Sequence, residues 1–477
     1  MSLRKQATSG MLWTFGQQFS TQIISFSISV VMARLLSPSD FGTIAMFGVV
    51  MSIGATLIDG GMASSLIRSK DTDEADLSTV FWFNLAIAVG LYIIIFFSAP
   101  LISRFYNIAI LTPVIRVYCL ILVIDSLVTV QIVKFTKELD FKTAFKIQLP
   151  SQIIGGLTGM LFAYFGFGIW SIVFYTLIQN TISTIQYWFY SDWRPSFVFD
   201  KKKFSDHFGF GYKLTLSNLL NTFFNNIYTV VIGKLFSPMQ LGFYNRADTL
   251  KQLPVNNLST ALNKVTFPLF SKLKDDNVKL KEVYKKLMKL VVFIIAPVLC
   301  LMIVIAQPMI RFLFTDKWLP AVPYFQVLAL AGILYPIHAY NLNILKVKGR
   351  SDLFLKLEVI KKVLIVVVLI VSLRYSIMGL VWGQVFISVM SFFINTYYTG
   401  RILKYGPLSQ AFDLLPTILV SAVLAVLFYY INYYFLASYI DFVQILAVSA
   451  GYIVLYLIAI KLLKFKEIIY LKELLKR

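Results

Sequence analysis

The chain has 477 residues, of which 58% are hydrophobic and 14% are charged. Soluble domains usually carry about 25% charged residues, and so few charged groups cannot cover so large an apolar mass in water. The composition therefore excludes an ordinary soluble protein, and it also excludes disordered, collagen-like and disulfide-rich chains.

Apolar windows follow one another along the chain and predict an all-α integral membrane protein with about fourteen transmembrane helices. A spanning helix takes about 20 residues, so fourteen of them use on the order of 280. In chain order the windows are 11–36, 41–66, 79–102, 110–133, 145–165, 168–190, 210–235, 241–270, 287–313, 320–346, 354–374, 377–399, 411–433 and 440–462. The first window is too long for the core of a signal peptide, so no cleavable signal is expected.

Lys and Arg are divided unequally between the two sets of connections. With the N-terminus in the cytoplasm, 34 of the 44 Lys and Arg residues lie in the tails and the even-numbered connections, and 6 lie on the opposite face. Cytoplasmic loops of membrane proteins carry such an excess. The pattern predicts that both termini are cytoplasmic. It also explains the net charge of +21 by topology and lipid headgroups rather than by nucleic acid.

Residues 34–42 and 234–242 share the pattern Arg/Lys-Leu-Leu/Phe-Ser-Pro-x-x-Phe/Leu-Gly at an offset of 200. The same offset aligns polar residues of the preceding helices, pairing Gln18 with Asn218, Thr21 with Asn221, Ser25 with Asn225 and Ser29 with Thr229. Six spans separate the copies, so both have the same orientation. We therefore expect two pseudo-symmetric six-helix bundles, 1–200 and 201–405, followed by two additional transmembrane helices and a cytoplasmic tail at 406–477.

The aligned polar residues recur at steps of three and four, which places them on one helical face. One interpretation is that this face lines a hydrated cavity, and the other is that it joins helices by hydrogen bonds. The Ser-Pro turns are expected to be structural, with Pro ending one helix and Gly allowing a tight reversal.

The window 241–270 is unusually polar, because it carries Arg246, Asp248, Lys251 and Lys264. Ionisable side chains within a membrane are costly and are hypotheses for function by default. We interpret Arg246 and Lys251 as the border of an aqueous cavity, where they could hold phosphate. The alternative is an internal ion pair, with Asp248 and Lys251 at i and i+3, that holds the bundle together.

Three other charged residues lie inside predicted spans. Arg116 is near an outer end, where its side chain can reach the interface, and Asp125 follows in the same window. Asp59 precedes Gly60-Gly61 and is interpreted mainly as a helix-end feature. Asp59, Asp125 and Asp248 are candidates for coupling to a proton or sodium gradient.

Three segments give the chain a resemblance to a known superfamily. They are ARLLSPSDFG at 33–42, its echo KLFSPMQLG at 234–242, and ADTLKQLP at 247–254 continuing to FPLFSK at 267–272. The chain resembles the multidrug/oligosaccharidyl-lipid/polysaccharide (MOP) exporter superfamily and, more narrowly, the bacterial Wzx-type O-antigen and capsular-polysaccharide flippases. The resemblance covers essentially the whole chain.

The resemblance implies a V-shaped pair of bundles around a cavity that opens alternately to each side of the bacterial cytoplasmic membrane. The implied substrate is undecaprenyl pyrophosphate bearing an oligosaccharide. A polysaccharide polymerase and chain-length machinery are implied partners. In the lipid II flippases of this superfamily a cavity arginine stands where this chain has Thr249, and Arg246 lies one turn earlier. The substrate-binding set is therefore predicted to be Arg246, Lys251, Asp248, Asn218, Asn221, Asn225, Gln18, Arg116 and Lys264.

Two other functions compete with the flippase prediction. A multidrug exporter of the same superfamily is the alternative, although such proteins tend to have acidic cavities and twelve helices. A membrane glycosyltransferase or polymerase is disfavoured, because the chain has no long outer loop, paired carboxylates or metal-ligand spacing. Cys119 and Cys300 are expected to be buried thiols. We expect no enzyme activity, no cofactor and no metal. Direct use of ATP is not expected either, because the chain has no nucleotide-binding Gly-rich loop. Besides a proton or sodium gradient, the membrane potential is an expected source of energy for transport.

Overall fold

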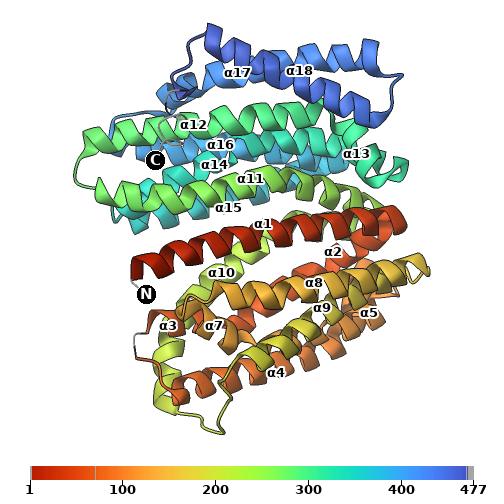
Figure 1. The fold of residues 1–477 in the computed structure, drawn as a ribbon, viewed down its shortest axis with the longest axis vertical. Helices are drawn as coiled ribbons and strands as arrows, with labels where there is room; N and C mark the ends of the chain where they lie inside the picture. The colour runs from red at the N-terminus through yellow and green to blue at the C-terminus, as the bar shows by residue number, and fades with distance from the viewer. Residues whose placement is uncertain (1–2, 70, 469, 471–477) are drawn as a thin grey trace. The chain divides into compact units, whose positions relative to one another are not determined.

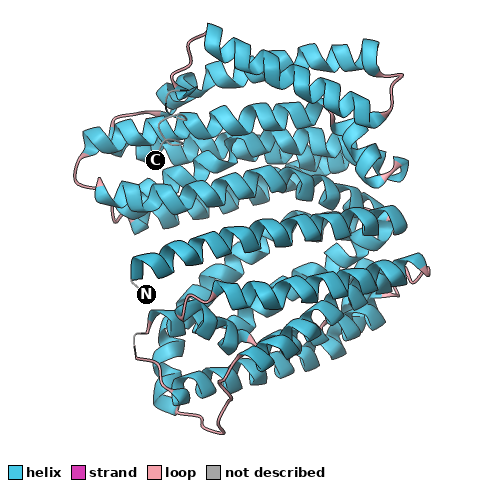
Figure 2. Ribbon diagram, viewed as in Figure 1, coloured by secondary structure: helices cyan, strands magenta, loops and turns pink. Residues whose placement is uncertain are grey.

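The computed structural model describes residues 3–69, 71–468 and 470, without the side chains of residues 3–15, 17 and 261–265. Every regular element in this part of the chain is helical, and the connections are short (Figure 1, Figure 2). By packing, the chain divides into two compact units, Met1–Gly242 (unit 1) and Phe243–Arg477 (unit 2).

Unit 1 consists of ten helices and the first turn of an eleventh. They are α1 (Leu3–Leu35), α2 (Pro38–Asp59), α3 (Met62–Arg68), α4 (Glu74–Tyr106), α5 (Leu111–Tyr118), α6 (Leu120–Ser126), α7 (Thr129–Lys137), α8 (Phe141–Tyr164), α9 (Ile169–Tyr190) and α10 (Lys201–Leu235). The eleventh, α11 (Pro238–Lys272), continues into unit 2. Within unit 1, α8 packs against α1 and α9, and α10 packs against α2, α3 and α4.

Unit 2 contains the remainder of the chain. Its elements are α12 (Asn277–Val304), α13 (Ala306–Phe314), η1 (Asp316–Ala321), α14 (Val322–Val347), α15 (Ser351–Ser372), η2 (Leu373–Tyr375), α16 (Ser376–Leu403), α17 (Pro407–Ile431), η3 (Asn432–Leu436) and α18 (Asp441–Leu462). The helix α12 packs against α14 and α17, and most of its apolar side chains are buried. The largest fully buried side chains of this unit include Trp318, Tyr284 and Tyr340.

Each of the fourteen predicted windows is mainly helical, and eight helical segments of the described chain are long and apolar enough to cross a membrane. The protein is therefore a multi-pass, all-α membrane protein, and the count of fourteen crossings stays a prediction. The helices α1, α8, α9, α10 and α11 are not among the eight, because polar residues interrupt their apolar runs. These more polar helices include three that contribute to the cavity described below.

Several windows predicted as single helices are broken. The window 110–133 becomes α5, α6 and α7, with interruptions at Cys119 and at Leu127-Val128. Here the hydroxyl of Ser126 donates to the carbonyl of Val123 over 2.7 Å, and that of Thr129 donates to the carbonyl of Asp125 over 3.1 Å. Such bonds from Ser and Thr back to the preceding turn bend helices. Hydropathy cannot register them, which is why the window reads as continuous.

The window 41–66 is also broken, between α2 and α3. Gly60 and Gly61 have φ of 52° and 69°, the left-handed conformation that glycine adopts without strain. A Cβ atom on Gly61 would lie 2.5 Å from the carbonyl oxygen of Gly211 in α10. Glycine at these positions therefore both ends α2 and lets α10 approach the turn backbone to backbone.

The duplicated Ser-Pro segments have the same local structure. Asp40 and Ser37 form a reciprocal cap at the start of α2, with backbone-to-side-chain bonds of 2.9 and 3.2 Å. Gln240 and Ser237 repeat this arrangement at the start of α11, with both bonds at 3.2 Å. A residue at N3 that returns a bond to the N-cap is the capping-box arrangement. In both copies Pro occupies the first helical position, so it begins a helix rather than ending one.

The glycines of the two copies contact each other's segment. A Cβ atom on Gly42 would overlap the carbonyl of Pro238, and a Cβ atom on Gly242 would overlap the carbonyl of Pro38. The contact is reciprocal, as expected for two copies related by a pseudo-twofold axis. The expectation that these glycines permit a tight reversal is therefore wrong, because both are helical and are required for close approach of the two helix starts.

The first turns of α10 are anchored to α3 and α4 by a polar network. The imidazole of His207 lies 2.8 Å from the hydroxyl of Ser65 through Nδ1 and 3.2 Å from the carboxylate of Asp76 through Nε2. Lys203 lies 3.3 Å from Asp76 and forms an ion pair with Asp73. This packing explains why unit 1 extends to Gly242. The boundary predicted at 200/201 describes the sequence repeat and stays a prediction about the symmetry of the bundles.

Candidate functional site

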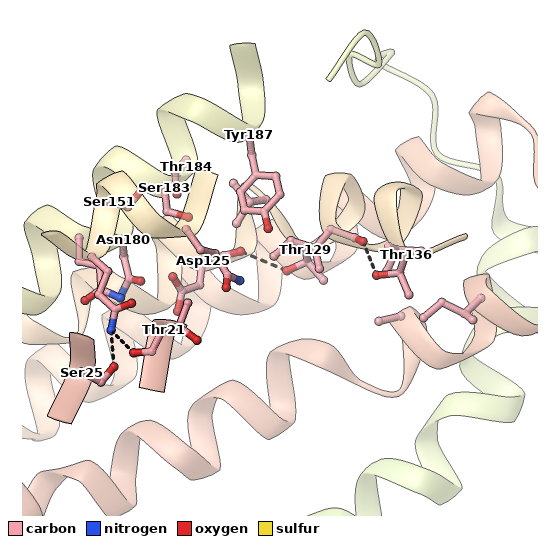
Figure 3. A pocket seen from close by; sticks show the side chains of 18 residues that line it. Thr21, Ser25, Asp125, Thr129, Thr136, Ser151, Asn180, Ser183, Thr184 and Tyr187 are labelled. Carbon is pink, nitrogen blue, oxygen red and sulfur yellow. Dashed lines mark hydrogen bonds between the residues drawn. The ribbon is translucent and has the colours of Figure 1, made fainter. Parts of the chain in front are cut away.

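A polar cavity of about 570 Å³ lies inside unit 1. It is enclosed by α1, α3, α6, α7, α8 and α9, and Figure 3 shows the side chains that line it. The lining residues are Thr21, Ser25, Ala63, Ile67, Asp125, Val128, Thr129, Ile132, Val133, Thr136, Gln148, Ser151, Gln152, Gln179, Asn180, Ser183, Thr184 and Tyr187. Most of these side chains carry a hydroxyl, amide or carboxylate group. Such a lining favours water or a polar ligand over hydrocarbon, because buried polar groups require hydrogen-bond partners.

A second cavity, of about 410 Å³, adjoins the first and shares Thr21, Ile132, Thr136, Gln148 and Tyr187 with it. Gln18, Asp140 and Phe141 lie in its wall. It therefore extends toward the connection between α7 and α8, which the charge pattern places on the cytoplasmic side. The two cavities therefore lie side by side within one unit, with five lining residues in common.

Hydrogen bonds hold part of this lining in place. The side-chain amide of Gln152 donates to the carbonyl of Thr21 over 3.0 Å and also to the hydroxyl of Ser25, which ties α8 to α1. The amide of Gln186 donates to the hydroxyl of Ser151 over 3.0 Å, which ties α9 to α8. These bonds use polar groups as helix–helix connections, and they also fix the positions of the groups beside them.

Other polar groups of the lining are free. Within the described part of the chain, the side chains of Gln179, Asn180 and Ser183 on α9 make no hydrogen bond. The carboxylate of Asp125 is exposed and has no ion pair there either. In Figure 3 Asp125 lies among Thr21, Thr129 and Asn180. Asp125 lies next to the end of α6, beside the break at Leu127-Val128.

The predicted polar face of α1 is partly accounted for by this cavity. Thr21 and Ser25 line the larger space, and Gln18 lines the smaller one. On α10, Asn218, Asn221 and Asn225 are exposed, and they line neither cavity. The α1 face therefore both lines a cavity and joins helices. The backbone carbonyl of Thr21 and the hydroxyl of Ser25 accept hydrogen bonds from α8, and both residues border the larger cavity.

The predicted cationic site on α11 has a different structure. The guanidinium of Arg246 is buried, with 7% of the residue exposed, and lies 4.8 Å from the ring centroid of Phe314 and 5.0 Å from that of Trp318. Lys251 forms an ion pair of 2.5 Å with Asp248, which also accepts from Gln252. In this conformation Arg246 is covered by aromatic rings and Lys251 is paired. The prediction that these residues bind substrate stays a prediction.

The remaining predicted residues lie apart from the cavity. The guanidinium of Arg116 donates to the carbonyl of Phe96 over 3.2 Å and stacks on its ring at 4.4 Å. The carboxylate of Asp59 accepts from the backbone of Gly61 and Ala63, as expected for a residue at a helix end. The side chain of Lys264 lies outside the described residues. No group of three or more potential metal ligands occurs in the described chain.

The contribution of α8 and α9 to the cavity was not predicted from the sequence. Gln148, Ser151 and Gln152 on α8, and Gln179, Asn180 and Ser183 on α9, recur at steps of three or four. This spacing is the signal that could have identified them, since it is the one used for α1. A search that starts from charged residues misses these six residues, because uncharged polar side chains have a lower free-energy cost of burial within a membrane.

The family model for "Polysaccharide biosynthesis protein" matches residues 31–323. The chain belongs to this polysaccharide biosynthesis protein family. In a separate comparison, the chain is 26% identical over 435 residues to the teichuronic acid biosynthesis protein TuaB of Bacillus subtilis (strain 168), with 89% of each chain covered. It is 25% identical over 404 residues to the lipopolysaccharide biosynthesis protein WzxC of Escherichia coli (strain K12), with 83% of this chain and 82% of WzxC covered.

The fold of this family member is also found in solved structures. The inward closed conformation of the lipid II flippase MurJ has a TM-score of 0.71 and 17% identity, with 95% of this chain and 99% of MurJ covered. An inward-facing multidrug resistance MATE transporter of the MOP superfamily has a TM-score of 0.61 and 17% identity, with 80% of this chain and 96% of the transporter covered. The predicted resemblance to Wzx-type proteins is confirmed, and the fold is similar to that of a transporter of the MOP superfamily.

Proposed function

We propose that the protein is a flippase that moves an oligosaccharide linked to undecaprenyl pyrophosphate from the cytoplasmic to the outer leaflet of the bacterial cytoplasmic membrane. The observation that carries the proposal is the polar cavity inside an apolar helical unit of a polysaccharide biosynthesis protein. Transfer of a polar headgroup across a bilayer is costly without such a space, because hydrocarbon provides no hydrogen-bond partners. The likeness of the fold to that of a lipid II flippase supports the proposal.

The proposed cycle is alternating access, in which a cavity opens to each side in turn. The polyprenyl tail stays in the bilayer while the headgroup occupies polar space. A proton or sodium gradient, or the membrane potential, provides the driving force, with Asp125 as the first candidate for ion coupling because its carboxylate faces the cavity. A polymerase and chain-length machinery would use the exported glycan. We propose no enzymatic step.

One observation favours a second function, export of organic cations. Within the part of the chain that the structure describes, Asp125 is the sole charged residue lining the larger cavity, and a lone carboxylate suits a cationic ligand. Membership of the polysaccharide biosynthesis family favours the glycan substrate over this alternative.

The test uses the full-length protein in lipid vesicles with undecaprenyl pyrophosphate carrying a fluorescent oligosaccharide. A membrane-impermeant quencher reports how much label has changed leaflet. We expect faster translocation than in protein-free vesicles. An equal rate in both would contradict the proposal, and accumulation of rhodamine 6G in place of glycan movement would establish the cation exporter.

A further inference from the structure

The polar lining of the unit 1 cavity is concentrated on α8 and α9. Gln148, Gln179 and Asn180 present amides, each of which has both donor and acceptor groups, and Ser183 adds a hydroxyl. The groups on α9 are not used by other described side chains. A ligand that fits them must donate and accept hydrogen bonds from neighbouring atoms, as sugar hydroxyls do.

The other part of the lining is apolar. Ala63 and Ile67 come from α3, and Val128, Ile132 and Val133 come from α7 and the residue before it. A sugar ring has hydroxyls at its edge and C–H groups on its faces, so it matches a cavity with polar and apolar walls. Small-molecule sites generally combine an apolar wall with a few polar groups that fix orientation.

The charge of the two cavities excludes phosphate as their ligand. Of the described residues, Asp125 is the one charged residue that lines the larger cavity, and Asp140 is the one that lines the smaller. Asp140 already accepts bonds from the backbone of Thr143 at 3.1 Å and from its hydroxyl at 2.6 Å. Among the described side chains neither wall contains Lys or Arg, so a pyrophosphate there would face carboxylates without a counter-charge from these residues. A carboxylate accepts strong bonds from hydroxyls, however.

The size and shape fit a short stretch of sugars. The larger cavity, at about 570 Å³, lies within the range of about 300–1,000 Å³ found for small-molecule sites. The adjoining cavity lengthens it toward the connection at 137–141. An oligosaccharide is elongated in the same way, whereas its polyprenyl anchor requires lipid.

We propose that this cavity binds the uncharged sugar part of the lipid-linked glycan and excludes its phosphates. The proposal rests on the proposed function, because it assigns one portion of that substrate to unit 1. The free groups of Gln179, Asn180 and Ser183 are specificity-determining contacts for the sugar. The pyrophosphate must then be held elsewhere while the glycan lies in the cavity.

The experiment compares two probes bound to the full-length protein in lipid nanodiscs. One is undecaprenyl pyrophosphate, and the other is the same lipid carrying a neutral disaccharide of N-acetylglucosamine. We expect the wild-type protein to prefer the glycosylated lipid. Loss of one sugar-contacting group in Asn180→Leu or Ser183→Ala should reduce affinity for that lipid by about 2- to 12-fold, because a net hydrogen bond contributes about 0.5–1.5 kcal/mol. Affinity for the bare lipid should be unchanged.

The matched control is Thr181→Val, because Thr181 is exposed next to Asn180 on α9 but does not line the cavity. It should bind both probes as the wild type does. Equal affinity of the wild type for the two probes, or equal losses for both probes in the variants, would overturn the sugar site and leave the proposed function standing. If the wild type binds neither probe and flips no glycan in vesicles, both proposals fail.

Discussion

Asp125 and Arg246 illustrate two structural environments for a charge inside a membrane protein. Arg246 is covered by Phe314 and Trp318, whose ring faces attract a cation. Asp125 instead faces a polar cavity, where water or a ligand can solvate it. From the sequence, both charges are expected to be energetically costly within the membrane. The sequence does not indicate which of the two is covered by aromatic rings and which faces a cavity. The rings that cover Arg246 lie more than sixty residues away in the chain, so local spacing carries no information about them.

The proposed ion-coupling role of Asp125 predicts the behaviour of Asp125→Asn. In vesicles that flip glycan, a pH gradient imposed across the membrane should accelerate the wild type, and Asp125→Asn should be insensitive to it. Asparagine retains hydrogen-bonding groups but cannot take up a proton near neutral pH. The measurement is the translocation rate with and without the gradient.

The matched control for this prediction is Asp59→Asn. The Asp59 carboxylate is bound by backbone groups at the end of α2, so this variant should keep its response to the gradient. A gradient response that survives in Asp125→Asn would show that ion coupling uses another group.

At the scale of elements, the start of α2 and the start of α11 depend on the same short pattern. The sequence predicts the repeat, and the structure adds that the two copies pack on one another through Gly42 and Gly242. Glycine is required here because a side chain would occupy the space of the partner's backbone. The physical reason is invisible in a single sequence, where a glycine after proline is equally compatible with a turn.

Gly42→Ala should therefore destabilise the protein by about 1–3 kcal/mol, the usual cost of overpacking a close contact. Gly48→Ala is the matched control, since Gly48 lies in the same helix and a Cβ atom there would have no neighbour within 4 Å. That variant should be neutral or slightly stabilising, because alanine favours helix by up to about 1 kcal/mol. Unfolding of both variants in detergent, followed by intrinsic fluorescence, provides the comparison. Equal stability of the two would contradict the packing role.

The anchoring of α10 predicts a dependence on pH. The side chain of Lys203, and next the backbone amide of Asp76, lower the pKa of Asp73 from 3.8 to about 2. A lowered pKa means that folding favours the charged carboxylate. This contribution to stability is fully present above the unfolded pKa near 3.8 and is lost as pH falls toward 2. Asp73→Asn should remove that part of the acid sensitivity.

The measurement for this prediction is the unfolding temperature of the wild type and of Asp73→Asn between pH 6 and pH 2. Asp276→Asn is a useful comparison, because Asp276 caps α12 in unit 2 and its pKa is also lowered, chiefly by a bond from the backbone of Lys279. Identical acid profiles for the wild type and Asp73→Asn would show that the Asp73–Lys203 pair does not stabilise the anchor.

At the scale of the whole molecule, the distribution of Lys and Arg predicts the orientation in the membrane. The segment 272–289, which runs from the end of α11 into the first turns of α12, contains seven Lys residues and is expected at the cytoplasmic side. The short turn at 166–168 is expected on the opposite side. Cys119 and Cys300 are buried, with exposures of 1% and 4%, so they provide little background for thiol labelling.

Single cysteines introduced at exposed positions, with Cys119 and Cys300 retained, test this orientation. Phe167→Cys should react with a membrane-impermeant maleimide in intact spheroplasts. Asp275→Cys, which is also at an exposed position, should react only after the membrane is permeabilised. The reverse pattern would invert the predicted topology, and labelling of both in intact spheroplasts would contradict the odd number of crossings predicted between the two positions.

The amino-acid sequence by itself determined the all-helical membrane class, the repeated Ser-Pro segments and the family, because these depend on composition and on patterns along the chain. Only the tertiary structure decided which polar residues share a space. The cavity joins residues from 21 to 187, and the aromatic cover of Arg246 comes from α13 and η1. Hydropathy reports how costly a side chain is in lipid, whereas its solvation depends on neighbours that folding brings together from distant parts of the chain.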